Sequence, residues 1–129
     1  MLFCEDFMET RKRVMLRRRE KEYLENKRAA LIFVKRRIEE LNLAYGFAFK
    51  RVGVRNQSTR WGSCSRRGNL SFNYRILFLD PHLADYLVVH ELCHLREFNH
   101  SKRFWGLVAE TIPDFKEARK ALRKFGSVS

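Results

Sequence analysis

Two histidines and a glutamate stand in the sequence at a spacing that suits metal-dependent hydrolysis. His90 and His94 are four residues apart, and Glu91 directly follows the first of them. On a helix, side chains four positions apart lie on one face, about 5–6 Å apart between Cβ atoms, so both imidazoles can bind one ion. Glu91 lies beside the pair, where its carboxylate can reach a metal-bound water as a general base without being a ligand. The pattern predicts a zinc centre that hydrolyses peptide bonds.

A catalytic zinc ion usually takes three protein ligands and keeps its fourth position for water. His100 is the leading candidate for the third ligand, but on a continuous helix it would face away from His94. Asn99 precedes it, and asparagine tolerates the left-handed conformation that turns a chain at a helix end. We therefore predict that the helix ends before His100 and that the chain turns back. The alternatives are three carboxylates of the following segment: Glu110, Asp114 and Glu117.

A short pattern of this kind also occurs by chance on helices, so a core helix that merely carries histidines is the rival interpretation. The flanking residues are apolar: Leu87, Val88, Val89, Leu92 and Leu95. The cluster would therefore be buried, and buried imidazoles and a carboxylate without a metal would carry unpaired polar groups at a cost. This favours metal binding. Cys93 is offset from the face of His90 and His94, and we interpret it as a core residue.

The elements that position these residues follow from the hydrophobic pattern. Five apolar residues recur at helical spacing in the first half of the chain: Leu24, Leu31, Val34, Ile38 and Leu41. They predict a helix that begins near Arg19. Residues 47–55 and 69–78 are rich in β-branched and aromatic types and predict strands, joined by a glycine- and serine-rich connection at 57–69.

The second half of the chain predicts helices. Asp80 and Pro81 suit the N-cap and the first position of a helix that carries the histidines to about Glu97. Ser101 and Pro113 would open two more. Helix, two or three strands and then helices make an α+β domain with a small sheet.

Two longer segments resemble the YgjP-like zinc metallopeptidases, which are relatives of the WLM and SprT-type proteins. They are TRWGSCSRRGNLSFNYRI, residues 59–76, and VVHELCHLREFNHSKRFW, residues 88–105. The resemblance spans roughly residues 20–125. It implies a zincin-like fold, in which an amino-terminal helix precedes the small sheet, the HExxH helix and the carboxy-terminal helices.

The resemblance also implies roles for residues. His90, His94 and His100 would be the Zn²⁺ ligands, and Glu91 the catalytic base of a metal-dependent hydrolase acting on peptides or proteins. It divides the chain into a basic arm or helix extension at 1–19 and a metallopeptidase domain at 20–129.

The segment at 59–76 has a structural and a functional interpretation. Structurally, Trp61 would be a core anchor, while Gly62 and Gly68 would serve a turn. Functionally, the segment would lie near the metal, because a strand beside the active helix of a zincin can pair with an extended substrate. Trp61 is then a possible cleft residue, and Asn73 or Tyr74 a possible hydrogen-bond donor to the transition state.

The chain is strongly basic, with 27 Lys and Arg against 15 Asp and Glu. Residues 1–60 hold 16 of the basic and 8 of the acidic groups, with RKRVMLRRR at 11–19. Such a half would attract polyanions, although a solvated face is the plainer interpretation. The basic half leaves one alternative, a nucleic-acid-binding module with a structural zinc. The resemblance implies another, a protease associated with DNA, because SprT-type relatives include proteases that act on proteins attached to DNA. Three histidines beside a glutamate favour an open, catalytic site over a closed, structural one.

Three cysteines without a CxxC pattern suggest reduced thiols. The sequence has no signal-like segment and no apolar run long enough to cross a bilayer. We expect a cytoplasmic protein without a membrane partner, and its oligomeric state is left open.

Overall fold

The computed structural model describes residues 2–124, and side chains from residue 7 onward. The elements are α1 (Leu2–Leu41), β1 (Arg51–Arg55), β2 (Gly62–Cys64), β3 (Asn69–Asn73), α2 (Pro81–His94), α3 (Lys102–Thr111) and α4 (Phe115–Arg123). Two 3-10 helices, η1 (Asn42–Ala44) and η2 (Tyr74–Phe78), follow α1 and β3. The predicted α+β class is confirmed, with four α-helices and one small sheet in this part of the chain.

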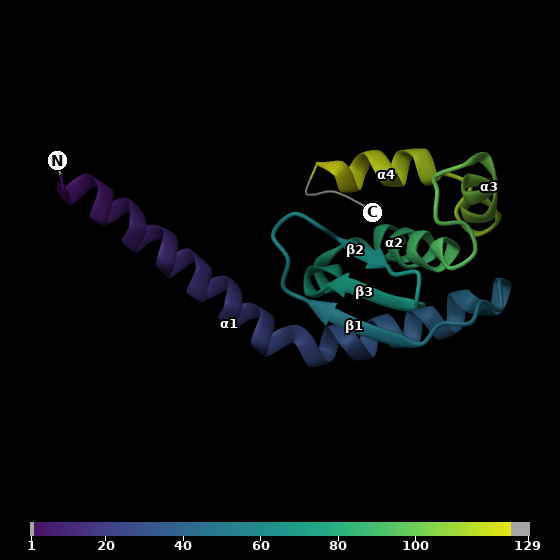
Figure 1. Cartoon of the computed structure of the whole chain (residues 1–129), viewed down its shortest axis with the longest axis horizontal. Helices are drawn as coiled ribbons and strands as arrows, with labels where there is room; N and C mark the ends of the chain where they lie inside the picture. Colours follow the sequence, from purple (N-terminus) through teal and green to yellow (C-terminus); the bar gives the residue numbers. More distant parts are fainter. Residues whose placement is uncertain (1, 125–129) are drawn as a thin grey trace.

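The sheet has the strand order β1-β3-β2 (Figure 1). β1 runs parallel to β3, while β2 runs antiparallel to it and forms one edge. The connection predicted at 57–69 therefore contains a strand of its own. Its three residues, Gly-Ser-Cys, have none of the β-branched or aromatic character by which strands are recognised.

Several predicted boundaries shift for local reasons. The strand expected at 69–78 ends at Asn73, because the Asn73 side chain accepts a hydrogen bond from the Arg75 backbone N–H and opens η2. The strand expected at 47–55 begins only at Arg51, since the Phe47 backbone N–H donates to the side chain of Asn42 instead of a ladder. The last helix begins at Phe115 rather than Pro113.

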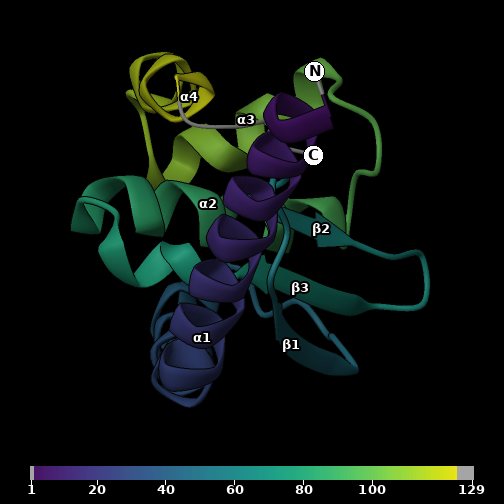
Figure 2. The same ribbon diagram turned by 90° about the vertical axis from the view of Figure 1, so that its left-hand side faces the viewer.

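The core lies where α1 and α2 meet each other and the sheet. α1 contacts β1 and η2, and α2 contacts β2, so both helices cover the sheet (Figure 2). Val34 and Ile38 of α1 are buried with Leu70 and Phe72 of β3. α2 is the central element, and nearly all of its second half is buried.

The first half of α1 extends away from this body (Figure 1). Side chains 7–18 are all exposed. The helix passes residue 19 without a break, and the division into an arm and a domain at that point stays a prediction. None of the helices in the described part of the chain is long and apolar enough to cross a membrane.

Candidate metal centre

α2 presents three of the predicted site residues from one buried helix. Its start is fixed by Asp80, whose side chain accepts a hydrogen bond from the His82 backbone N–H. In the second half of the helix, His90, Glu91 and His94 are 1%, 0% and 5% exposed. The apolar residues around them pack into the core, which holds the helix and the polar side chains it carries in place.

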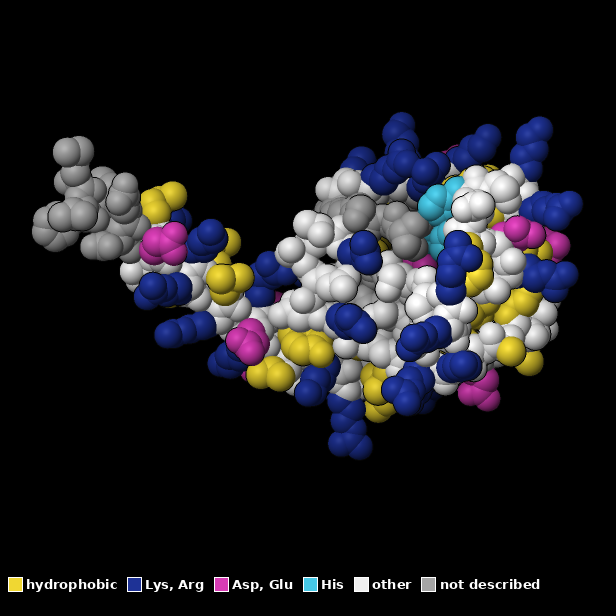
Figure 3. Space-filling view, in the orientation of Figure 1, with side chains coloured by type: hydrophobic (Ala, Val, Ile, Leu, Met, Phe, Trp, Pro, Cys, Tyr) yellow, Lys and Arg dark blue, Asp and Glu magenta, His cyan; other side chains and the backbone are white. Residues whose placement is uncertain are grey.

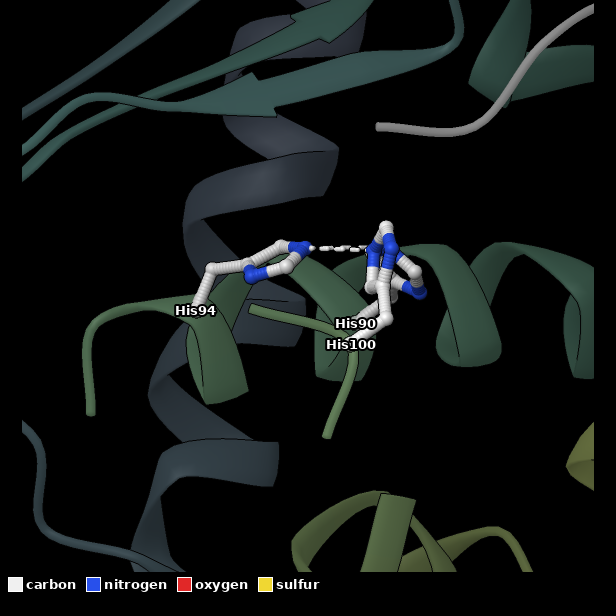
Figure 4. A group of neighbouring side chains, drawn as sticks. All are labelled: His90, His94 and His100. Carbon is white, nitrogen blue, oxygen red and sulfur yellow. Dashed lines mark hydrogen bonds between the residues drawn. The ribbon is translucent and has the colours of Figure 1, made fainter. Parts of the chain in front are cut away.

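His100 joins them from the loop that follows α2. Nε2 of His94 lies 3.2 Å from Nε2 of His90 and 3.1 Å from Nε2 of His100 (Figure 4). Two nitrogens bound to one zinc ion at about 2.0–2.1 Å with a tetrahedral angle lie about 3.3 Å apart. The three imidazoles, which point toward one another from two segments, therefore fit around one metal ion.

The turn that returns His100 differs from the prediction. Among the described residues only Gly46 and Gly68 have positive φ, so Asn99 does not take the left-handed conformation. Instead the helix tightens at its end, where the Leu95 and Arg96 backbone N–H groups donate to carbonyls three residues earlier. This ends α2 at His94, three residues earlier than predicted.

Hydrogen bonds on the outer side of two imidazoles determine which nitrogen faces the centre. Nδ1 of His94 lies 3.0 Å from the carbonyl oxygen of Glu97. A carbonyl only accepts, so this Nδ1 carries the proton and Nε2 keeps its lone pair for an ion. Nδ1 of His90 lies 3.2 Å from the Tyr86 hydroxyl, which can accept the same kind of bond. Such outer partners orient metal-binding histidines.

Aromatic rings of α3 cover the other side of the histidines. Ser101 caps this helix by accepting from the Phe104 backbone N–H. Phe104 stacks on His94 with centroids 4.4 Å apart, and Trp105 stacks on His100 at 5.6 Å. Sequence reasoning placed both rings on a helix but gave them no role at the site. The sequence did contain a signal: Phe104 and Trp105 are adjacent and lie in the first turn after the N-cap Ser101, which directly follows His100.

Glu91 lies directly beneath the edge strand. A Cβ atom on Gly62 would lie 3.0 Å from Glu91 Oε2 and 3.1 Å from the Ser71 carbonyl oxygen. Gly62 is the first residue of β2, so it does not serve a turn as predicted. Because glycine has no side chain, the Glu91 carboxylate fits against the strand at this position. Gly68, with φ of 89°, does occupy the turn between β2 and β3.

The possible cleft residues lie around this strand. Trp61 is buried and directly precedes Gly62.

The other two residues form hydrogen bonds within the fold. The Asn73 side-chain amide donates one hydrogen bond to the Gln57 carbonyl at 2.6 Å and another to the Arg60 carbonyl at 3.1 Å. The Tyr74 hydroxyl donates to Glu22 on α1 at 3.0 Å. A role for any of the three in a cleft stays a prediction.

Other candidate ligands lie outside the histidine group. Among the described side chains, the group of at least three candidate ligands whose atoms lie within 4.8 Å of one another consists of the three histidines and includes none of Glu110, Asp114 and Glu117. Asp114 pairs instead with His82 at 2.8 Å. Burial raises the pKa of the Cys93 thiol to about 12, which favours the protonated thiol at neutral pH, and Cys93 is not part of the histidine group.

Comparison with known proteins agrees with this geometry. Residues 6–125 match the family described as "YgjP-like, metallopeptidase domain". The fold is similar to the crystal structure of the metallopeptidase zymogen of Pyrococcus abyssi abylysin, with a TM-score of 0.64 and 24% identity. The likeness covers 70% of this chain and 92% of that one. No curated protein sequence is significantly similar. The predicted zincin-like arrangement is confirmed as a fold.

Proposed function

The chain belongs to the YgjP-like metallopeptidase family, and from that premise we propose that it is a zinc-dependent peptidase. The observation that carries the proposal is the convergence of three histidine Nε2 atoms beside a glutamate of the same helix. Its substrates are peptides or proteins. An odd cysteine count without CxxC suits a reducing compartment, and we place the activity in the cytoplasm.

Each side chain of the centre has a separate task in this proposal. His90, His94 and His100 would hold a zinc ion, which would act as a Lewis acid toward the scissile carbonyl and lower the pKa of water. Glu91 accepts a proton from the attacking water and passes it to the leaving nitrogen. Tyr86 and the Glu97 carbonyl hold the first two imidazoles in the ligating orientation.

The edge strand offers a way to position the substrate. Within the described residues β2 pairs only with β3, so its other edge has no strand partner among them. An extended peptide that pairs with β2 would pass over Glu91, because that carboxylate lies against Gly62. Main-chain pairing of this kind holds the peptide whatever its side chains are.

The substitution Glu91→Gln tests the proposal, because it keeps the shape of the side chain and removes its basicity. We expect the variant to bind one zinc ion and to lose at least about a hundredfold in turnover. The measurement is cleavage of a diverse peptide library, followed by mass spectrometry, with metal content determined on the same samples. Glu117→Gln is the matched control, since it removes the same charge from an exposed position of α4. Equal turnover by Glu91→Gln and the wild type would rule out this mechanism.

The exposed start of α1 favours a second function, which is binding of nucleic acid. Seven basic side chains stand there: Arg11, Lys12, Arg13, Arg17, Arg18, Arg19 and Lys21. Between residues 7 and 21 only Glu9 and Glu20 oppose them. Neutralised phosphates release counterions, so binding to duplex DNA should weaken steeply as salt rises. The peptidase would then act on proteins associated with DNA.

Replacing Arg17, Arg18 and Arg19 together by glutamine tests this second function. We expect fluorescence anisotropy of a labelled duplex to show binding by the wild type at low salt and a large loss in the triple variant. Glutamine at Lys116, Lys120 and Lys124 of the α4 region removes as much charge elsewhere. Absence of binding at low salt, or equal loss in both variants, would contradict a role of the arm.

A further inference from the structure

Arg119 of α4 is a half-buried cation without a carboxylate partner. Its guanidinium carbon lies 5.0 Å from the centroid of the Trp105 ring. No ion pair or hydrogen bond joins its side chain to another residue of the described chain, whereas Arg37 is paired with both Glu40 and Asp85. A guanidinium carries five donors in a fixed plane, a geometry that matches a carboxylate. No acceptor among the described residues takes a hydrogen bond from this guanidinium.

The cation lies close to the histidines. The Trp105 ring beneath it stacks on His100 at 5.6 Å and lies 5.8 Å from His90. Phe115, one turn before Arg119 on α4, stacks on the same indole at 4.9 Å and fixes its orientation. These distances place the guanidinium within about 11 Å of the His100 ring, a span of about three residues of an extended peptide.

The surface of the chain is rich in basic groups. On the face drawn in Figure 3, Lys and Arg side chains outnumber Asp and Glu side chains, and some of them lie close to visible histidine atoms. The net charge of the chain is +12. Such a field raises the local concentration of anionic substrates and repels cationic ones.

We propose that Arg119 binds a carboxylate of the substrate and makes the enzyme selective for peptides with a negative charge within about three residues of the scissile bond. This rests on the proposed peptidase function. The carboxylate belongs either to a glutamate or aspartate side chain or to the carboxyl end of the peptide. Arg119 is a specificity residue, which places the peptide by a bidentate, charge-assisted pair on a platform formed by Trp105.

The test uses binding, so that it does not depend on turnover. The zinc-loaded Glu91→Gln chain is titrated by calorimetry with three octapeptides of one sequence. One carries glutamate and an amidated end, the second carries glutamine and an amidated end, and the third carries glutamine and a free carboxyl end. We expect one or both of the charged peptides to bind about tenfold more tightly than the neutral one. Which of them does so identifies the source of the carboxylate.

Substitutions in the same background assign the selectivity to a residue. Arg119→Gln should remove it while leaving the affinity for the neutral peptide unchanged, which also reports that the fold is intact. Arg119→Lys should retain part of it, because lysine keeps the charge but not the planar fork. Lys120→Gln is the matched control and should retain all of it, since Lys120 is the next residue of α4 and is exposed.

Two results would overturn the inference: equal affinities for charged and neutral peptides, or selectivity that survives Arg119→Gln. Failure of the wild-type chain to cleave any peptide would instead count against the proposed function. The two failures are distinguishable, because the titrations measure carboxylate binding by a chain that is not asked to turn over.

Discussion

At the scale of single residues, the centre combines a pattern that is local in sequence with contacts that are not. His90, Glu91 and His94 are recognisable because the helical repeat places them together. Gly62 and Tyr86 have no such signature. The need for glycine arises from the approach of Glu91, which is 29 residues away, and becomes visible only when β2 lies over α2.

Gly62→Ala tests this approach. The added methyl group would lie 3.0 Å from Glu91 Oε2 and 3.1 Å from a backbone carbonyl oxygen, so the carboxylate or the strand must shift. A displacement of about 1 Å can cost roughly a hundredfold in rate, and we expect at least a tenfold loss of turnover with zinc content unchanged.

Gly53→Ala is the control for that experiment, because a Cβ atom at Gly53 of β1 meets nothing within 4 Å. Peptide cleavage rates of the two variants are compared under identical conditions. Equal rates for Gly62→Ala and Gly53→Ala would mean that Glu91 does not require the space.

At the scale of elements, the sequence predicted structure well where a side chain acts on its own backbone. Asp80 and Ser101 are N-caps as expected, because their carboxylate and hydroxyl oxygens accept hydrogen bonds from backbone N–H groups two and three residues later. The helix α2 does end before His100 as predicted, but its last residue is three positions earlier than expected, and the existence of β2 was missed. Neighbouring residues do not determine either feature. The strand β2 is stabilised by its pairing with β3, and the loop after α2 contains no residue that ends a helix by itself.

The contact between α1 and α2 includes a bidentate ion pair. Nε and Nη2 of Arg37 lie 2.8 and 2.9 Å from the two carboxylate oxygens of Asp85, and both side chains are about three-quarters buried. We expect Arg37→Ala to lower the free energy of unfolding by about 1 kcal/mol or slightly more, because it leaves a partly buried carboxylate unpaired.

Urea unfolding measures this difference, with Arg36→Ala as the reference. Arg36 is the preceding residue of α1 and is exposed, so its replacement should change stability by only a few tenths of a kcal/mol. Equal midpoints for the two variants would show that the ion pair does not hold the two helices together.

At the scale of the whole molecule, a compact body carries a projecting helix. Side chains 7–18 of α1 are exposed, while Glu22 and Tyr23 form hydrogen bonds with the body. A chain that begins at residue 19 should therefore keep the melting temperature and zinc affinity of the full chain and lose its affinity for DNA.

Thermal unfolding followed by circular dichroism measures the first of these properties. A truncation that lowers the melting temperature by several degrees would mean that the arm packs on the body, and would contradict its assignment as a separate polyanion-binding extension.

The central claim is that three histidines hold one zinc ion, and elemental analysis of zinc per chain tests it most directly. We predict about one zinc ion per wild-type chain and per Glu91→Gln chain, and a sharp loss in His100→Ala, because two imidazoles alone leave the ion under-coordinated. If the His100→Ala chain bound zinc as well as the wild type, the three-histidine site would be contradicted, and a carboxylate would be the better candidate for the third ligand.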